Sequence, residues 1–391
     1  MTIPTASTGL SVLHVLPGSD FGGAEGVVFR LARAERSRGI DSRVVSLKPE
    51  GSLGAQFHAG GVPLASLNLE AGPAAIPAVW RWRRKGDGLP FHVAVGWLPA
   101  GNLMAGIAAG RRRGLVWNVM QADLGPQLNR FSTRLLIKGE AWLSSRWPHR
   151  IVCNSLAAQS AHHRSGFDPS RMVVVPNGVD TELFKNKDGA RERLTNRLGV
   201  GNGVLLVGIL ARWDPHKDHR TFIHAADRLV QGGVDAHFLL AGPGVTPANP
   251  VLAGWIGETS EPGRFHLLGP VEDAAEFLSS LDVACLSSVA ESSPYALVEA
   301  MACGIPCVST DAGDARIVLG EGGTIVPVQD PGAFEMALRV LADLRSDERR
   351  QIGAAGRRRA ARDFSFAVMS LRYEAIYREA AGRTAEAPPP R

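Results

Sequence analysis

Short apolar runs followed by amphipathic stretches recur along this chain, and this alternation constrains its fold more than any other feature. Leu10–Leu16 precedes the amphipathic stretch Ala24–Arg36, and Val204–Ala211 precedes a second one, Asp218–Val230. His237–Ala241 is a further apolar run, and it ends in a Gly/Pro loop. Strand-length apolar runs that alternate with helical patterns are typical of parallel, doubly wound α/β sheets. Because the pattern starts again after residue 200, the sequence predicts two Rossmann-like domains.

The length of 391 residues also favours two domains, because a single hydrophobic core rarely serves so long a chain. We expect a first domain over residues 1–180 and a second over residues 181–364. Residues 365–381 are expected to form a helix that packs back on the first domain, and residues 382–391 a disordered tail. Doubly wound sheets bind ligands at the carboxyl ends of their strands, so we expect a ligand in a cleft between the domains.

Cysteine usage and the apolar pattern indicate the compartment. Four cysteines lie in apolar settings without a CxxC pair or zinc spacing, which predicts buried, reduced thiols; they are Cys153, Cys285, Cys303 and Cys307. Residues 1–9 lack the basic and apolar regions of a signal peptide, and no apolar run is long enough to cross a bilayer. We therefore expect a cytoplasmic protein that does not span a membrane.

Positive charge is concentrated in the first half of the chain. Residues 1–180 contain 20 Lys and Arg against 11 Asp and Glu, a balance of +9, whereas the remainder has 23 against 27, a balance of −4. The basic clusters are Arg81–Lys85, Arg111–Arg113 and a predicted helix with Arg130, Arg134, Lys138, Trp142, Arg146 and Trp147. Basic residues beside tryptophan suit the inner face of an anionic cell membrane or a polyanionic acceptor. The alternative is a solvated basic face without a partner. No helix-turn-helix, RNP or zinc-finger pattern occurs, so nucleic acid is not an expected partner.

The segment Ala290–Thr310 contains a predicted helix with clear start and stop signals. The helix is expected over residues 294–303, with Ser292 or Ser293 as its N-cap and a stop at Gly304.

Two glutamates lie on either side of that helix start. Glu291 precedes the helix, where free backbone N–H groups and the helix dipole favour an anion such as a diphosphate. Glu299 lies about one and a half turns inside it. The two carboxylates can therefore reach hydroxyl groups at opposite ends of a sugar-diphosphate-ribose ligand. Two glutamates on a solvated helix face are the alternative interpretation.

Several strand-end loops carry residues suited to phosphate binding. Arg212 follows a predicted strand directly and Lys217 comes five residues later. Two such cations can neutralise a diphosphate without a metal ion, although a plain surface pair is the alternative. Gly242 and Gly244 form a glycine-rich loop after the next strand, and Gly22-Gly23 form one at the first helix start. Neither loop is a dinucleotide or P-loop fingerprint.

Other polar residues near strand ends are weaker candidates. Asp311 and Asp314 follow a predicted strand and suggest either magnesium or a turn with Asx capping, and we favour the turn. His14 and His216 are the histidines nearest to these loops, but neither has partners for a catalytic triad.

Taken in order, these pieces resemble glycosyltransferase family 4, the retaining GT-B enzymes, over about residues 10 to 340. The likeness is closest to the branch that builds lipopolysaccharide and exopolysaccharide. The matching motifs are Gly22-Gly23-Ala24-Glu25, Cys153-Asn154-Ser155, Val175-Pro176-Asn177-Gly178-Val179-Asp180, Arg212 with Lys217-Asp218, and Glu291 to Glu299 running into Gly304.

The resemblance implies a transferase that moves a sugar from a nucleoside-diphosphate-sugar donor to a glycan or polyprenyl-linked acceptor, without cofactor or metal. Arg212 and Lys217 would hold the diphosphate and stabilise the leaving group, and Glu291 would contact the donor sugar; these are the expected catalytic residues. Glu299 would hold the ribose hydroxyls. The remaining donor-binding residues implied are Ser292, Ser293, Tyr295, Ala296, Gly242 and Gly244. The loop with Gly22 and Gly23 would present the acceptor.

Two departures from the family pattern fall on the acceptor side. Relatives often carry a histidine where this chain has Ala100, and an arginine where it has Met120. Two alternatives to the transferase therefore stay open. One is a GT-B sugar-nucleotide epimerase or phosphorylase, and the other is a non-catalytic nucleotide-sugar-binding protein.

Overall fold

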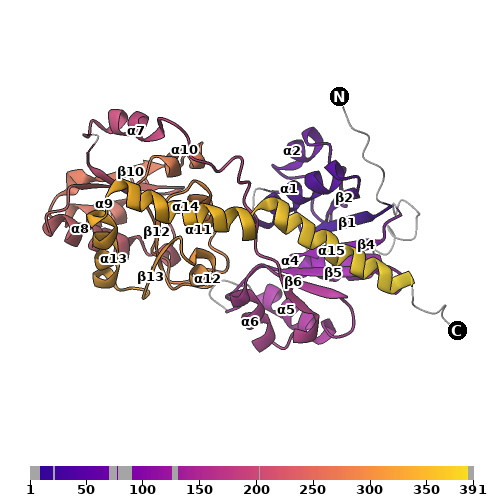
Figure 1. The fold of residues 1–391 in the computed structure, drawn as a ribbon. Helices are drawn as coiled ribbons and strands as arrows, with labels where there is room; N and C mark the ends of the chain where they lie inside the picture. The colour runs from indigo at the N-terminus through magenta and orange to yellow at the C-terminus, as the bar shows by residue number, and fades with distance from the viewer. Residues whose placement is uncertain are drawn as a thin grey trace, which may run out of the picture. The chain divides into compact units, whose positions relative to one another are not determined.

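A computed structural model describes residues 9–20, 23–69, 77, 90–125, 131–201 and 203–385 (Figure 1). The chain forms two compact units. The first comprises Met1–Pro176 together with Met369–Arg391, and the second comprises Asn177–Val368.

The first unit is built on a parallel sheet in the order β3-β2-β1-β4-β5-β6-β7. Its strands are β1 (Ser11–Leu16), β2 (Asp41–Ser46), β3 (Leu64–Ser66), β4 (Val93–Trp97), β5 (Gly114–Val119), β6 (Arg150–Cys153) and β7 (Met172–Val174). Its helices are α1 (Gly23–Ser37), α2 (Gly54–Ala59), α4 (Leu98–Ala109), α5 (Phe131–Leu143), α6 (Leu156–Arg164) and most of α15 (Phe366–Ala385). Strands β1, β4 and β5 are buried along their whole length, as expected for a sheet covered on both faces.

The second unit repeats this plan with a parallel sheet in the order β10-β9-β8-β11-β12-β13. Its strands are β8 (Leu205–Leu210), β9 (Ala236–Ala241), β10 (Phe265–Gly269), β11 (Val283–Leu286), β12 (Cys307–Thr310) and β13 (Gly323–Val326). Its helices are α7 (Ala190–Leu198), α8 (His219–Gln231), α9 (Pro250–Gly257), α10 (Ala274–Ser279), α11 (Tyr295–Ala302), α12 (Ala315–Leu319), α13 (Pro331–Asp343) and α14 (Ser346–Asp363). The expected α/β class with two doubly wound domains is confirmed.

The C-terminal helix α15 is tied to the first unit by polar contacts. Tyr373 donates its hydroxyl proton to Asn118 Oδ1 at 2.7 Å, and Glu379 Oε1 accepts from Arg150 Nη2, also at 2.7 Å. Figure 1 shows the end of this helix, in yellow, beside strands of the first sheet. The C-terminal residues thus complete the core of the domain in which the chain begins.

Two boundaries differ from the sequence-based prediction. The units divide between Pro176 and Asn177, where the sequence placed the boundary between residues 180 and 181. The residues that follow this boundary include helix α7, whose Leu194 and Leu198 pack against the core of the second unit. Helix α15 continues through residues 382–385, which were assigned to a disordered tail. Each residue added to an existing helix gains a backbone hydrogen bond. Gly382 costs about 1 kcal/mol relative to alanine in a helix interior, and this cost does not end α15. Residues 386–391 lie outside the described residues.

All four cysteines are free and buried, which confirms the expected thiols. Burial raises the pKa of Cys153 to about 12 and that of Cys303 to about 11, so these thiols stay protonated and unreactive at neutral pH.

Candidate functional site

The strand order of the second sheet reverses direction between β8 and β11. In doubly wound sheets the crevice outside the carboxyl ends of such a strand pair is where ligands bind. The residues that follow β8 include Arg212 and Lys217, and those that follow β11 include Ser288 and Glu291. The fold therefore brings the two predicted cations and the predicted carboxylate to one place.

The loop after β8 is shaped by Asp214, a residue that the sequence analysis did not single out. Its Oδ1 accepts a hydrogen bond from the His216 backbone N–H at 2.9 Å and lies 3.0 Å from His216 Nδ1. Its Oδ2 accepts from Arg212 Nη2 at 2.7 Å. Burial alone would raise the pKa of Asp214, but the hydrogen bonds from His216 and Arg212 lower it to about 2. Asp214 is therefore a permanent anion that holds the Arg212 guanidinium, whose side chain is 64% exposed.

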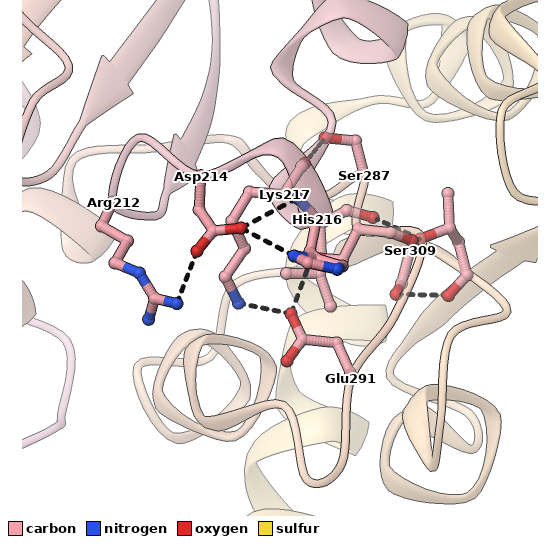
Figure 2. A network of polar contacts seen from close by, with 10 residues as sticks. Arg212, Asp214, His216, Lys217, Ser287, Glu291 and Ser309 are labelled. Atoms are coloured by element: carbon pink, nitrogen blue, oxygen red, sulfur yellow. Dashed lines mark hydrogen bonds and ion pairs between the residues drawn. The ribbon is translucent and has the colours of Figure 1, made fainter. Parts of the chain in front are cut away.

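A short 3-10 turn, Pro215–Lys217, carries the second cation toward β11. Lys217 Nζ donates to Glu291 Oε1 at 2.5 Å, and Ser288 Oγ donates to the same oxygen at 2.7 Å (Figure 2). The Lys217 and Glu291 side chains are only 21% and 11% exposed, so their attraction is screened less than that of a surface pair. The Ser287 hydroxyl donates to the Lys217 carbonyl at 2.8 Å and fixes the turn against β11.

The serines at positions 287 and 288 were also missed by the sequence analysis. Both are buried and follow an apolar strand directly. Thr310 Oγ1 donates to the Ser288 carbonyl at 2.6 Å, which links this loop to the end of β12. Small hydroxyl residues directly after a buried strand are a signal that could have identified them.

The start of helix α11 differs from the expectation. Pro294 is the N-cap residue, with an extended ψ of 92° and no side-chain cap, so the prediction of Ser292 or Ser293 is wrong. The Pro294 carbonyl accepts the first helical hydrogen bonds, from the N–H groups of Leu297 and Val298, and helical conformation therefore begins only at Tyr295.

The predicted donor-binding residues of α11 share one side of the helix. Tyr295, Ala296 and Glu299 are half-buried, whereas the remaining residues of the helix are buried in the core. Ser292 and Ser293 before the helix are also half-buried. These five side chains therefore lie where a ligand can reach them.

Two glycines let backbone segments approach closely around this site. Gly242 has φ +143°, and a Cβ there would lie 2.2 Å from the Ala211 carbonyl oxygen, next to Arg212. Gly244 follows in the same loop. Gly313 has φ +56°, and its Cβ would lie 2.1 Å from the Glu291 carbonyl oxygen. Any other residue at position 242 or 313 would displace a strand-end loop that carries a candidate ligand-binding group.

The aspartates after β12 contact neighbouring groups of the second unit. Asp311 accepts from Arg316 Nη2 at 2.7 Å, and the Asp314 N–H donates to the Ser292 carbonyl at 3.3 Å. Within the described ranges no group of three or more His, Cys, Asp or Glu side chains is placed to hold a metal ion.

A separate pocket of about 530 Å³ in the second unit lies between α7, α10 and the end of β10. None of the residues of the Lys217–Glu291 network lines it, and its Arg193 already pairs with Glu276 at 2.7 Å. The charged side chains that lie close together, and not the volume of a pocket, therefore identify the candidate site.

The strand order of the first sheet also reverses direction, between β1 and β4. Gly23 begins α1 after β1, and a Cβ there would meet no atom within 4 Å, whereas Gly22 lies outside the described residues. His14 is buried within β1: Trp97 Nε1 donates to its Nδ1 at 3.1 Å, and its Nε2 lies 2.9 Å from Glu35 Oε2. Because Nδ1 accepts, Nε2 carries the proton toward Glu35, and His14 is a structural residue.

The two departures from the family pattern lie at neighbouring strand ends of this sheet. Ala100 is in the first turn of α4, and Met120 directly follows β5. Met120 lines a small pocket together with Leu98 and His162. Leu98 has a φ of +62°, unusual for a residue with a side chain and common where a site imposes the backbone.

Comparisons with known proteins agree with this arrangement. The model of the family described as Glycosyltransferase Family 4 matches residues 21–183, and that of Glycosyl transferases group 1 matches residues 201–343. The phosphatidyl-myo-inositol mannosyltransferase of Mycobacterium leprae is 27% identical over 91% of this chain and 92% of its own. The UDP-Gal:alpha-D-GlcNAc-diphosphoundecaprenol alpha-1,3-galactosyltransferase of Escherichia coli is 30% identical over 55% of this chain and 56% of its own. The structure of HepE from Anabaena with UDP superposes with a TM-score of 0.82 at 20% identity, covering 95% of this chain and all of that one.

These matches, with the two doubly wound sheets and the polar network at the second switch point, define a glycosyltransferase of the GT-B fold. The two matched regions together span most of both units. The chain therefore carries a Glycosyltransferase Family 4 domain over residues 21–183 and a Glycosyl transferases group 1 domain over residues 201–343.

Membrane spanning is a separate question. Among the described helices, none combines the length and apolar character needed to cross a bilayer.

Proposed function

We propose that the protein transfers a sugar from a nucleoside-diphosphate-sugar donor to a lipid-linked or glycan acceptor, with retention of configuration and without a metal ion. The observation that carries this proposal is the Lys217–Glu291 ion pair beside Arg212 at the switch point of the second sheet. It combines cations for a diphosphate with a carboxylate for sugar hydroxyls.

The cations act on the leaving group. Negative charge grows on the nucleoside diphosphate as its bond to the sugar breaks, and fixed cations stabilise that charge without reorganising. Arg212 offers planar, forked donors and Lys217 a compact charge. Asp214 and Glu291 hold both cations in place before the donor binds.

Glu291 has two roles in this proposal. One carboxylate oxygen, Oε1, accepts from Lys217 and Ser288, while Oε2 is available to the donor sugar. Glu299, on the half-buried side of α11, contacts the ribose. The acceptor hydroxyl attacks from the face that the diphosphate leaves, and the departing phosphate oxygen takes its proton, so no side-chain nucleophile is required.

Names of similar proteins support the substrate classes. The HepE structures contain UDP or UDP-glucose. The name of the mycobacterial relative mentions phosphatidyl-myo-inositol, and that of the E. coli relative mentions diphosphoundecaprenol. We propose a nucleotide-sugar donor and a lipid-linked acceptor on this basis. Such an acceptor lies in a membrane, so the proposal includes a peripheral contact between the basic first unit and anionic lipid.

Calorimetric titration with UDP and GDP tests the donor site. Each charge-assisted contact with the diphosphate is worth roughly 2 kcal/mol, so replacing Arg212 and Lys217 with Ala should weaken binding by at least about 100-fold. The control is the double variant Arg350→Ala and Arg358→Ala, which removes two exposed cations from α14. Unchanged affinity in the Arg212/Lys217 variant would exclude the proposed donor site.

Metal independence has its own test. Transfer assayed with crude lipid acceptor and a panel of nucleotide-sugars should persist in excess EDTA, since the cations replace a divalent ion. A strict requirement for magnesium or manganese would contradict this part of the proposal.

A further inference from the structure

Helix α5 of the first unit exposes large apolar side chains to solvent. Phe131 is 80% exposed, Leu135 61% and Trp142 70%. Its buried residues are only Ile137 and Glu140. A surface helix of a soluble protein normally turns its large apolar residues inward, so the exposure of these three side chains is unusual.

The exposed residues form a single stripe. Positions 131, 135, 138 and 142 are spaced by four, three and four residues, which at about 100° per residue places them within an arc of roughly 60°. Arg134 widens this arc to roughly 100°. The buried Glu140 lies nearly opposite the middle of the arc, and the buried Ile137 lies beyond its Arg134 edge. We call Phe131, Arg134, Leu135, Lys138 and Trp142 the α5 stripe.

The charge of the α5 stripe is entirely positive. Arg134 and Lys138 lie between its apolar members, and the Arg146 guanidinium lies 5.8 Å from the Trp142 ring centroid. The one acidic residue between positions 131 and 147 is Glu140, which is buried. Exposed aromatic and aliphatic side chains mixed with cations are typical of helices that lie in the interface of an anionic bilayer.

Other basic segments do not show this combination within the described residues. Arg111 and Arg112 are exposed at the end of α4, but Arg113 lies over the Phe91 ring at 4.3 Å. The cluster Arg81–Lys85 and Arg130 lie outside the described residues. Of the basic segments named from the sequence, α5 is the described one that combines exposed cations with large exposed apolar side chains.

The place of α5 in the fold suits a lipid-linked acceptor. Helices of a parallel α/β sheet run antiparallel to the strands, so the Phe131 end of α5 lies toward the carboxyl edge of β5. Met120 and the small acceptor-side pocket lie at that edge. A bilayer in contact with the whole stripe would therefore meet the first unit beside its candidate acceptor loops.

We propose that the α5 stripe docks on the surface of an anionic bilayer, with Phe131, Leu135 and Trp142 entering the interface and Arg134 and Lys138 contacting lipid phosphates. The inference rests on the proposed function in that a membrane-embedded acceptor gives docking its purpose. A polyanionic glycan would engage the two cations but gains nothing from an exposed leucine or phenylalanine.

Sedimentation with vesicles tests the docking directly. The wild-type protein should bind vesicles of phosphatidylcholine mixed with phosphatidylglycerol, and bind phosphatidylcholine alone much more weakly. Losing three interfacial apolar side chains by Phe131→Ser, Leu135→Ser and Trp142→Ser should weaken binding to the mixed vesicles by at least about 30-fold. Arg134→Gln with Lys138→Gln should weaken it by about 10-fold and reduce its sensitivity to salt.

A matched control removes equally exposed apolar side chains elsewhere. Met336 and Val340 on α13 are 61% and 60% exposed, and Met336→Ser with Val340→Ser should bind vesicles as the wild type does. Equal binding to both vesicle types, or wild-type binding by the α5 triple variant, would overturn the proposal. Equal loss in the α13 control would do so as well, because it would show a nonspecific effect.

UDP titration in solution separates this inference from the proposed function. The α5 triple variant should bind UDP as the wild type does, which also shows that it is folded. Vesicle binding without nucleotide binding in the wild type would refute the transferase and leave docking intact, whereas the reverse result would refute docking alone.

Discussion

Replacing Glu140 with Gln should stabilise the protein increasingly as pH rises. Glu140 lies on the buried side of α5, and its Oε1 accepts from Asn102 Nδ2 at 2.7 Å. The same Asn102 nitrogen donates to the Asn118 carbonyl at 3.0 Å. Burial raises the pKa of Glu140 to about 8, against the ordinary 4.5, and the Asn102 hydrogen bond only partly opposes this. The folded protein therefore carries Glu140 as the neutral acid at pH 7.

The sign and size of the effect follow from this pKa. Because the folded state keeps the proton to higher pH, unfolding releases it between pH 4.5 and about 8, and the free energy of unfolding falls as pH rises through that window. At about 1.4 kcal/mol per pH unit, the loss from Glu140 is roughly 3 kcal/mol by pH 7 and on the order of 5 kcal/mol in all. Glutamine keeps the oxygen that Asn102 requires and cannot ionise, so Glu140→Gln removes this loss.

Urea denaturation at a series of pH values measures the difference. The variant and the wild type should have similar free energies of unfolding near pH 4.5, and the variant should be more stable by several kcal/mol at pH 8. The exposed Glu321→Gln serves as the control and should follow the wild type throughout. Curves for Glu140→Gln and wild type that run parallel from pH 4.5 to 8 would refute the reasoning that Glu140 is buried as a neutral acid.

Three further predictions concern the second unit. Asp214→Asn keeps the contact with the neighbouring backbone N–H but no longer holds the Arg212 guanidinium in place, so calorimetry should show UDP binding about 3-fold to 10-fold weaker; unchanged or tighter binding would contradict the positioning role of Asp214. Gly313→Ala should push the Glu291 backbone aside and weaken UDP binding by at least about 10-fold while the protein stays folded by circular dichroism; wild-type affinity would contradict the close approach. Asn249→Ala removes the N-cap of α9 and should lower the free energy of unfolding by about 1 kcal/mol in urea denaturation, with no change in UDP affinity; a change in affinity would contradict the assignment of Asn249 as a structural cap.

Much of the fold could be read from local patterns. The run Leu10–Leu16 contains β1, Val204–Ala211 contains β8, and the amphipathic stretch Asp218–Val230 contains nearly all of α8. Hydrophobic periodicity depends only on residues that are close in sequence, so it can be recognised without knowing how the rest of the chain folds. Cap and boundary positions were less predictable. Pro294, and not one of the serines before it, is the N-cap residue of α11, because the backbone torsion angles at that one residue decide where the helix begins.

The candidate site was predicted in part. Arg212 and Lys217 were identified because charged residues after apolar strands are visible in the sequence, and Glu291 because it precedes a predicted helix start. Asp214 and Ser288 were not, since their roles depend on which side chains they meet across the loop. A carboxylate close to an arginine in sequence carries no signal that it will hold that arginine in place.

The sequence by itself therefore determined the alternation of strands and helices, the two-domain plan and the types of charged residue at strand ends, because these depend on spacing along the chain. Tertiary structure alone decided which of these residues meet. It brought the loops after β8 and β11 together, since hydrogen bonding between non-consecutive strands sets the switch point. It also decided which side of α5 is exposed: packing buried Ile137 and Glu140 and left Phe131 and Trp142 in solvent, an outcome that the composition of the helix does not specify.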